Sequence, residues 1–301
     1  MKATRPAVAL AVILLGVTAS AQQPSSSSQV READRMLSAG DIAGATAALR
    51  KIVASAPASF DARLLLGRAL DLDAKHTEAR VQLEEAIRLA ADDQRTTALT
   101  ALGISYAFES KPDEAARYYQ RAFDADVQAD DRTTAAGRAN ALGRIYLESG
   151  NARKAEEWYR TGYEMSKKIP GLPAQQAALW EMRWHNAMGR IAARRGQTKA
   201  AQEHAAAVKA LLDRGGNEGQ AIFYPYLLGY IAFFAKDYRR AADELAKGDQ
   251  ADPFVLGLLG QAYQKLGDRA KAEGYFRQVM ATSDHTINSA FARPLARAFL
   301  R

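Results

Sequence analysis

Residues 142–159 read LGRIYLESGNARKAEEWY, and residues 259–276 repeat the same layout as LGQAYQKLGDRAKAEGYF. In both segments a Leu-Gly pair is followed by a tyrosine, a turn of Gly and Asn or Asp, an alanine and an aromatic residue. Apolar residues one turn apart on each side of the turn are typical of two helices that each bury one face. Gly favours the left-handed backbone that ends a helix, and Asn or Asp caps the next one. Each segment therefore predicts two helices joined by a tight turn.

The same spacing recurs along the chain. Seven times a small residue is followed twelve positions later by an alanine, in the pairs Ala33/Ala45, Gly67/Ala79, Gly103/Ala115, Gly143/Ala155, Gly189/Ala201, Gly229/Ala241 and Gly260/Ala272. A bulky apolar residue usually stands three positions after the small residue, and another four positions after the alanine. Helices that cross closely need small side chains at the crossing and bulky ones beside it. The pattern predicts an all-α solenoid in which each hairpin buries its face against its neighbours.

The spacing resembles that of the tetratricopeptide repeat family, from about Arg31 to Met280. The resemblance implies a right-handed α-solenoid of about seven hairpins over residues 31–285 and a capping helix over residues 286–301, with Pro294 either kinking that helix or in its first turn. The intervals between marker residues are 34, 36, 40, 46, 40 and 31, whereas the family period is 34 residues. We therefore expect longer helices or loops in the middle units. The tryptophan usual early in the family's repeat is absent from its expected positions.

The first 21 residues have a different character. Their start is basic, residues 7–17 are uninterruptedly apolar, and Ala19-Ser20-Ala21 offers small residues for cleavage. This pattern predicts a secretory signal peptide. The alternative is an uncleaved anchor, although the apolar run is roughly half of the ~20 residues that a spanning helix needs. Residues 22–30 contain four serines and predict a disordered linker.

The composition of the chain limits the kinds of partner that we expect it to bind. The chain of 301 residues has 41 Lys and Arg, 34 Asp and Glu, and a net charge of +7. Loss of Lys2 and Arg5 with the signal peptide would leave 39 basic against 34 acidic residues, or about +5. That excess is spread along the predicted helices and favours an acidic ligand only weakly. We expect an exported protein, periplasmic or secreted, with no membrane span after cleavage and no nucleic-acid partner. The chain has no cysteine, so its stability must come from packing.

Polar residues recur at positions that would line the concave surface. By the resemblance, these are the positions three before and one after the marker glycine on the first helix of each hairpin. The fourth and fifth units both place Asn in the first position and Arg in the second, and further arginines stand at equivalent or flanking positions. The predicted groove residues are Asn140, Arg144, Arg183, Asn186, Arg190, Arg194 and Arg68.

Asn donates and accepts hydrogen bonds at once, and Arg presents a planar fork that matches a carboxylate. The groove residues therefore predict a peptide ligand with an acidic side chain or a free C-terminus. The alternative is that these side chains face water or pair with nearby Glu148 and Glu181.

Aromatic residues crowd the first helix of the sixth unit, among them Phe223, Tyr226, Tyr230, Phe233 and Phe234. Tyr226, Tyr230 and Phe233 fall three or four residues apart, on one helix face. They either seal the junction with the seventh unit or form an apolar floor for the groove, since arginine and aromatic side chains are typical of binding hot spots. A second hypothesis is an envelope factor that binds glycan strands by stacking sugars on Tyr226 and Tyr230.

The sequence contains no recognisable catalytic constellation. Gly215-Gly216 has neither the following lysine nor the preceding strand of a phosphate-binding loop. The histidines lie in separate segments without metal-ligand spacing, at positions His76, His185, His204 and His285. We therefore expect a binding scaffold that is no enzyme and has neither a cofactor nor a metal.

Overall fold

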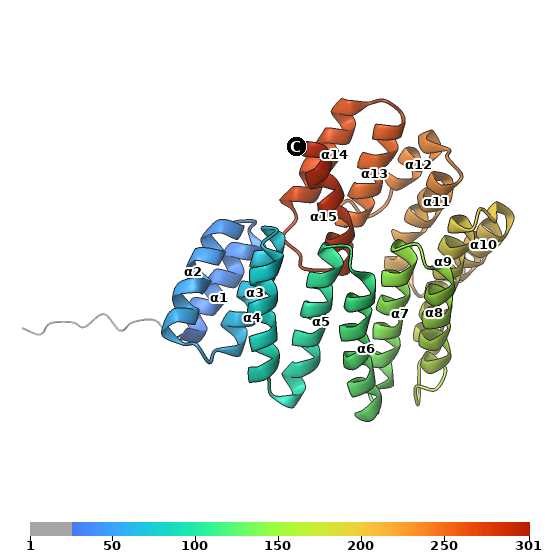
Figure 1. The fold of residues 1–301 in the computed structure, drawn as a ribbon. Coiled ribbons are helices and arrows are strands. Elements are labelled where there is room, and N and C mark those ends of the chain that lie inside the picture. Colours follow the sequence, from blue (N-terminus) through green and yellow to red (C-terminus); the bar gives the residue numbers. More distant parts are fainter. Residues whose placement is uncertain (1–25) are drawn as a thin grey trace, which may run out of the picture.

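The computed structural model describes residues 26–301, and this part of the chain forms fifteen α-helices and a short 3-10 helix (Figure 1). In chain order the helical hairpins are α1 (Ser26–Ser38) with α2 (Ile42–Ser55), α3 (Phe60–Leu72) with α4 (His76–Leu89), α5 (Asp92–Phe108) with α6 (Pro112–Gln128), α7 (Arg132–Glu148) with α8 (Ala152–Ser166), α9 (Ala174–Arg194) with α10 (Thr198–Asp213), α11 (Phe223–Phe234) with α12 (Tyr238–Leu245), and α13 (Pro253–Lys265) with α14 (Arg269–Ala281). The 3-10 helix η1 (Glu218–Gln220) precedes α11, and α15 (Ile287–Leu300) ends the chain. The all-α fold of seven hairpins is confirmed.

The predicted signal peptide, residues 1–21, lies outside the described residues. The linker predicted over residues 22–30 is wrong from Ser26 onward, because α1 begins there and its apolar face packs on α2. None of the helices in residues 26–301 combines the length and apolarity needed to cross a membrane.

The turns inside the hairpins have the chemistry that the sequence predicted. Gly150 and Gly267 take positive φ values of +89° and +79°. The side chains of Asn151 and Asp268 then accept hydrogen bonds from the backbone N–H groups three residues on, at 3.1 Å each. These contacts satisfy donors that a helix start would otherwise leave unpaired. Three other hairpin turns use a non-glycine residue with positive φ, at Ala74, Ser110 and Lys236, and Asp130 takes this conformation between the hairpins, after α6.

Small marker residues lie where the helices of a hairpin approach most closely. A Cβ atom added to Gly67 would lie 2.5 Å from Leu83 Cγ, and one added to Gly260 would lie 2.7 Å from Phe276 Cε1. The bulky residue stands sixteen positions after the glycine in both hairpins. Glycine is therefore required for contact with the bulky side chain of the second helix, as the repeat predicted.

The middle units have longer helices, as predicted. Helix α9 has 21 residues, and α5, α6 and α7 have 17 each, whereas α3 and α13 have 13. The fifth unit also departs in packing, because Ala205 replaces the bulky residue and Gly189 approaches Leu227 of the next hairpin instead.

Helix α15 does more than cap the last hairpin. It packs on α13 and α14 and also on α5, so the C-terminal end of the ribbon returns to its N-terminal half (Figure 1). Pro294 lies inside α15 rather than in its first turn, so that alternative is wrong.

Five residues hold this return contact, which we term the C-terminal clasp: Asp71, Leu72, His285, Arg293 and Arg297. His285 Nε2 lies 2.8 Å from Asp71 Oδ2. Arg293 and Arg297 each donate from Nη2 to the carbonyl of Leu72, at 3.0 and 3.1 Å. Arg293 Nη1 also donates to carbonyls at the end of α14. Guanidinium groups therefore satisfy carbonyls at the C-terminal ends of two helices, where the helix dipole favours positive charge.

Candidate binding cavity on the concave surface

A cavity of about 610 Å³ lies among the first helices of the fourth, fifth and sixth hairpins. Helices α7, α9 and α11 form most of its walls, and the start of α15 and single residues from other elements complete them, namely Tyr159 of α8, Val208 of α10, Gln220 of η1 and Asp252 just before α13. Six of the ten residues predicted to bind a ligand line this cavity, namely Asn140, Arg144, Arg183, Asn186, Arg190 and Tyr226. The helical phase of the repeat thus places polar residues from two successive units around one space.

The other four predicted residues do not line it. Arg194 and Tyr230 lie beside the cavity and are hydrogen-bonded to each other at 2.8 Å. Phe233 packs against Phe234 and Tyr238, with ring centroids 5.4 and 5.5 Å apart. Arg68 lies on α3, among the residues of the N-terminal half. The structure therefore does not bring Arg68 or Phe233 into the site.

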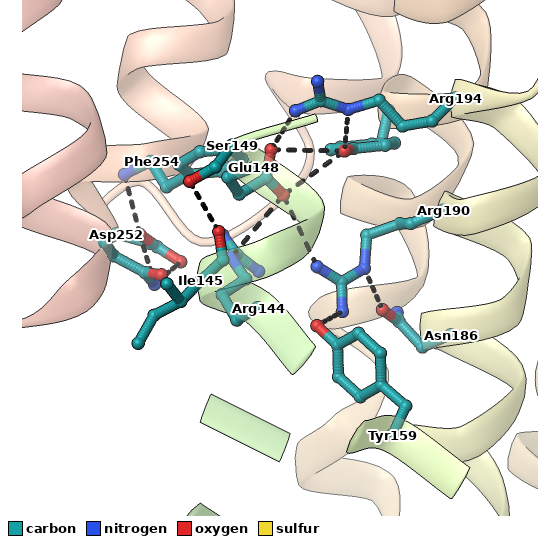
Figure 2. A network of polar contacts seen from close by, with 12 residues as sticks. Arg144, Ile145, Glu148, Ser149, Tyr159, Asn186, Arg190, Arg194, Asp252 and Phe254 are labelled. Atoms are coloured by element: carbon teal, nitrogen blue, oxygen red, sulfur yellow. Dashed lines mark hydrogen bonds and ion pairs between the residues drawn. The ribbon is translucent and has the colours of Figure 1, made fainter. Parts of the chain in front are cut away.

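Glu148, at the end of α7, is the centre of the polar network (Figure 2). Its side chain is 3% exposed. It accepts hydrogen bonds from Arg194 and from the hydroxyl of Tyr230, which is 3.2 Å from each carboxylate oxygen. Arg144 Nε and Arg190 Nη1 each lie 3.7 Å from Glu148 Oε1. Pairing with Glu148, which the sequence left as an alternative, thus occurs for three of the predicted arginines.

Aromatic rings fix the orientation of the buried guanidinium groups. Arg144 lies over Phe254, 4.2 Å from the ring centroid, and Arg190 lies over Tyr159 at 5.5 Å. Arg190 also donates from Nη2 to the Tyr159 hydroxyl and from Nε to Asn186 Oδ1, both at 3.0 Å. The amide oxygen of Asn186 therefore holds Arg190 in place.

Several donors in the cavity wall remain unpaired. Among the described residues, Nε and Nη2 of Arg144, Nη1 of Arg190 and the hydroxyl of Tyr226 are buried without a hydrogen-bond partner. The 3.7 Å distances to Glu148 are ion pairs rather than hydrogen bonds. Each buried unpaired donor costs roughly 1–3 kcal/mol. A ligand that brings an acceptor group would recover this free energy.

Burial and charge have opposing effects on the ionisation of these groups. Burial alone would lower the pKa of Arg190, but the hydroxyl oxygens of Tyr159 and Tyr226 and the carboxylate of Glu148 favour the charged form and raise the pKa, so the guanidinium stays charged. Burial raises the pKa of the Tyr226 hydroxyl, which stays a neutral donor. Burial also raises the pKa of Asp252, although nearby Arg144 counteracts this.

Two aromatic residues of α11, Tyr226 and Tyr230, belong to the core. Tyr226 is 7% exposed and Tyr230 is 0% exposed. Tyr226 makes edge contacts with Tyr230 and, across the next junction, with Phe254 of α13, at 5.9 and 6.3 Å. Phe234 rather than Phe233 packs on Tyr230, at 4.7 Å. The stripe thus seals the junction with the seventh unit, and the hypothesis of sugar stacking loses the exposed ring of Tyr230 on which it depended.

The four histidines lie in separate segments of the sequence, but the fold brings them together in two pairs. His185 and His204 face each other with 2.9 Å between their Nδ1 atoms, because α9 and α10 form one antiparallel hairpin. His76 and His285 both contact the buried carboxylate of Asp71.

Successive helical hairpins, whose first helices surround a shared cavity, make this protein an α-solenoid. The chain contains tetratricopeptide repeats, since two tetratricopeptide repeat models match it, one over residues 94–168 and the other over residues 255–286. No curated protein matches the sequence.

Solved structures agree with this assignment of the fold. A tetratricopeptide repeat protein from Parabacteroides merdae is 13% identical, with a TM-score of 0.52 over 92% of this chain and 99% of that one. The nearly identical TPR-like repeats of a kinesin light chain protein from Podosopora anserina are 18% identical to this chain, with a TM-score of 0.52 over 62% and 95%. The type IV pilus biogenesis factor PilW is 14% identical, with a TM-score of 0.50 over 74% and 91%. At these identities the similarity shows the fold alone.

Proposed function

We propose that this protein is an exported scaffold that binds a peptide or protein segment on the concave surface of its solenoid. The tetratricopeptide fold supports a role in protein–protein interaction. The observation that supports the location is the convergence of Asn140, Arg144, Asn186 and Arg190, from two successive hairpins, on one cavity. These residues offer donors for an acidic side chain or a terminal carboxylate of the partner.

The cavity is preorganised for binding. Arg190 is held by Asn186, Tyr159 and Glu148, and Arg144 is stacked on Phe254. Side chains that are already ordered lose little conformational entropy when a ligand arrives. The partner segment is then the component that becomes ordered.

Export to a bacterial periplasm is part of the proposal and is supported by the sequence of residues 1–21. A fusion of residues 1–21 to a phosphatase that folds only outside the cytoplasm tests it. We expect activity from the fusion and none after Leu14 and Leu15 are both changed to Arg. Activity that is equal with and without this change would refute export by this segment.

The binding role is tested by capture from an envelope extract with residues 22–301 as bait. Arg183→Glu is the informative change, because Arg183 lines the cavity but is exposed, so reversing its charge does not add a carboxylate beside Glu148. Arg240→Glu is the matched control, since Arg240 is exposed on α12 and does not line the cavity. We expect a partner that is lost with Arg183→Glu and retained with Arg240→Glu at unchanged helicity. Equal capture by both variants would refute this location of the site.

A further inference from the structure

Unpaired buried donors are concentrated in the central cavity. Across the described residues, eight buried side-chain nitrogen or oxygen atoms lack a hydrogen-bond partner. Four of the eight belong to Arg144, Arg190 and Tyr226, which all line the cavity of about 610 Å³. Native structures leave few such atoms, so their clustering at one space indicates a missing acceptor group.

The charge of the cavity wall indicates that this acceptor is an anion. Arg144, Arg183 and Arg190 line the cavity, whereas Asp252 is the one carboxylate among its lining residues. Asp252 is already occupied, because it accepts hydrogen bonds from the backbone N–H of Phe254 and, at both carboxylate oxygens, from the Asn288 amide, at 2.8 to 3.0 Å.

Glu148 neutralises only part of the remaining charge. It accepts a hydrogen bond from Arg194 but lies 3.7 Å from Arg144 and Arg190, too far for hydrogen bonds to either. The two buried guanidinium groups therefore retain donors for another oxyanion. Their positions over Phe254 and Tyr159 keep those donors in place.

A further part of the wall is apolar. It includes Leu179 and Met182 of α9, Val208 of α10, Phe223 of α11 and Ile287 of α15. Phe223 is 41% exposed, unlike most large apolar side chains of residues 26–301. A bare inorganic anion would leave this wall in contact with water. The volume of about 610 Å³ lies within the range of roughly 300–1,000 Å³ that is usual for small-molecule sites.

We propose that the cavity binds an amphiphilic organic acid, with its carboxylate on Arg144 and Arg190 and its apolar body against the wall of α9, α10 and α15. The inference deepens the proposed function and rests on one part of it, namely that the protein binds its ligand on the concave surface. Two sources share this chemistry: a free aliphatic or aromatic acid, and the carboxyl end of a peptide with an apolar last residue.

Calorimetric titration of residues 22–301 with chemically matched probes tests the proposal. The probes are octanoate, octanamide, inorganic phosphate, and one pentapeptide ending in Phe as its free acid and as its amide. We expect octanoate or the peptide acid to bind at one site, while octanamide, the peptide amide and phosphate bind at least tenfold more weakly. Binding by octanoate indicates a free acid as the source, and binding by the peptide acid alone indicates a peptide end.

Two variants and a control link the binding to the cavity. Arg144→Gln removes a guanidinium yet leaves Glu148 with Arg190 and Arg194, and should weaken binding of the acid roughly ten- to hundredfold, as expected for a hydrogen bond to a charged group. Arg183→Gln, at an exposed position, should weaken it too and remains informative if Arg144→Gln fails to fold. Arg240→Gln should leave binding unchanged.

The outcomes separate this inference from the proposed function. Capture of an envelope partner without binding of either acid would overturn the inference and leave the scaffold role intact. Binding of octanoate without any captured partner would support the inference and count against the scaffold role. Equal binding of octanoate and octanamide, or acid binding unaffected by both cavity variants, would overturn the inference.

Discussion

Gly143 and Gly137 lie on the same helix, α7, but differ in their surroundings. A Cβ atom on Gly143 would lie 2.7, 2.8 and 2.9 Å from Cδ2, Cγ and Cε2 of Tyr159. That ring cannot move away freely, because it is 5% exposed and its hydroxyl accepts a hydrogen bond from Arg190. A Cβ atom on Gly137 would meet no atom within 4 Å outside the nearby backbone of its own helix. The two glycines thus form a matched pair for measuring the contact between α7 and α8.

Alanine at either position gains helix propensity, worth about 0.8–1.0 kcal/mol over glycine. We expect Gly137→Ala to stabilise the protein by roughly that amount. Gly143→Ala receives the same gain but also overpacks Tyr159, at a cost of roughly 1–3 kcal/mol. The free energy of unfolding should therefore be lower for Gly143→Ala than for Gly137→Ala by roughly 1–3 kcal/mol. Unfolding in urea, monitored by circular dichroism, measures this difference in free energy, provided that the m-values of the two variants agree. Equal midpoints for the two variants would refute the close approach that defines the repeat.

Other predictions follow from the buried polar groups. Glu148→Gln should lower the free energy of unfolding by about 3 kcal/mol, because it leaves buried guanidinium groups without their carboxylate; an unchanged urea midpoint would contradict the network. Arg293→Met should cost roughly 1–3 kcal/mol for each carbonyl left unpaired in the clasp, and native-state hydrogen exchange should show faster exchange in α15. Burial lowers the pKa of His285, with Asp71 opposing it, and the pKa of Asp71 is also lowered by its histidine partners despite burial. Because both pKa values are lower in the folded protein, both groups contribute to its stability at neutral pH. The contribution of His285 is lost as the pH falls below the pKa of histidine in the unfolded chain, about 6.5, and the contribution of Asp71 is lost only in stronger acid. The Tm should therefore fall as the pH is lowered from 7.5 to 5.5, and it should fall less in His285→Gln. An equal fall in both proteins would rule out protonation of His285 as the cause.

Features that depend on residues near one another in the chain could be predicted from the sequence. The contact of Gly260 with Phe276 spans sixteen residues, and its two members recur at fixed spacing, so the hairpin follows from the pattern. The same holds for Asn140 and Arg144, because the phase of α7 alone determines which residues face inward.

Features that depend on how the ribbon curves could not be predicted. The clasp joins Arg293 to Leu72, which are 221 residues apart, and no local pattern indicates that pairing. Glu148 was visible one helical turn after Arg144, but its role as the common partner of three arginines depends on how α7, α9 and α11 meet. Tyr230 falls at the spacing of either a groove or a core residue, and only the position of the seventh unit decides between them.

The cavity arises from the irregularity of the repeat. Gly67 is the eighth residue of α3, a helix of 13 residues, whereas Gly189 is the sixteenth residue of α9, a helix of 21 residues. A helix with the length of α3 around Gly189 would begin at Met182, so Leu179 would lie outside it. The extra turns of α9 therefore supply Leu179 to the apolar wall, while the return of α15 supplies Ile287 on another side. A regular array with a period of 34 residues would preserve the arginines of the groove but would lack much of the apolar wall. The long interval before Gly189 and the C-terminal clasp thus convert an open concave surface into a site with a defined volume.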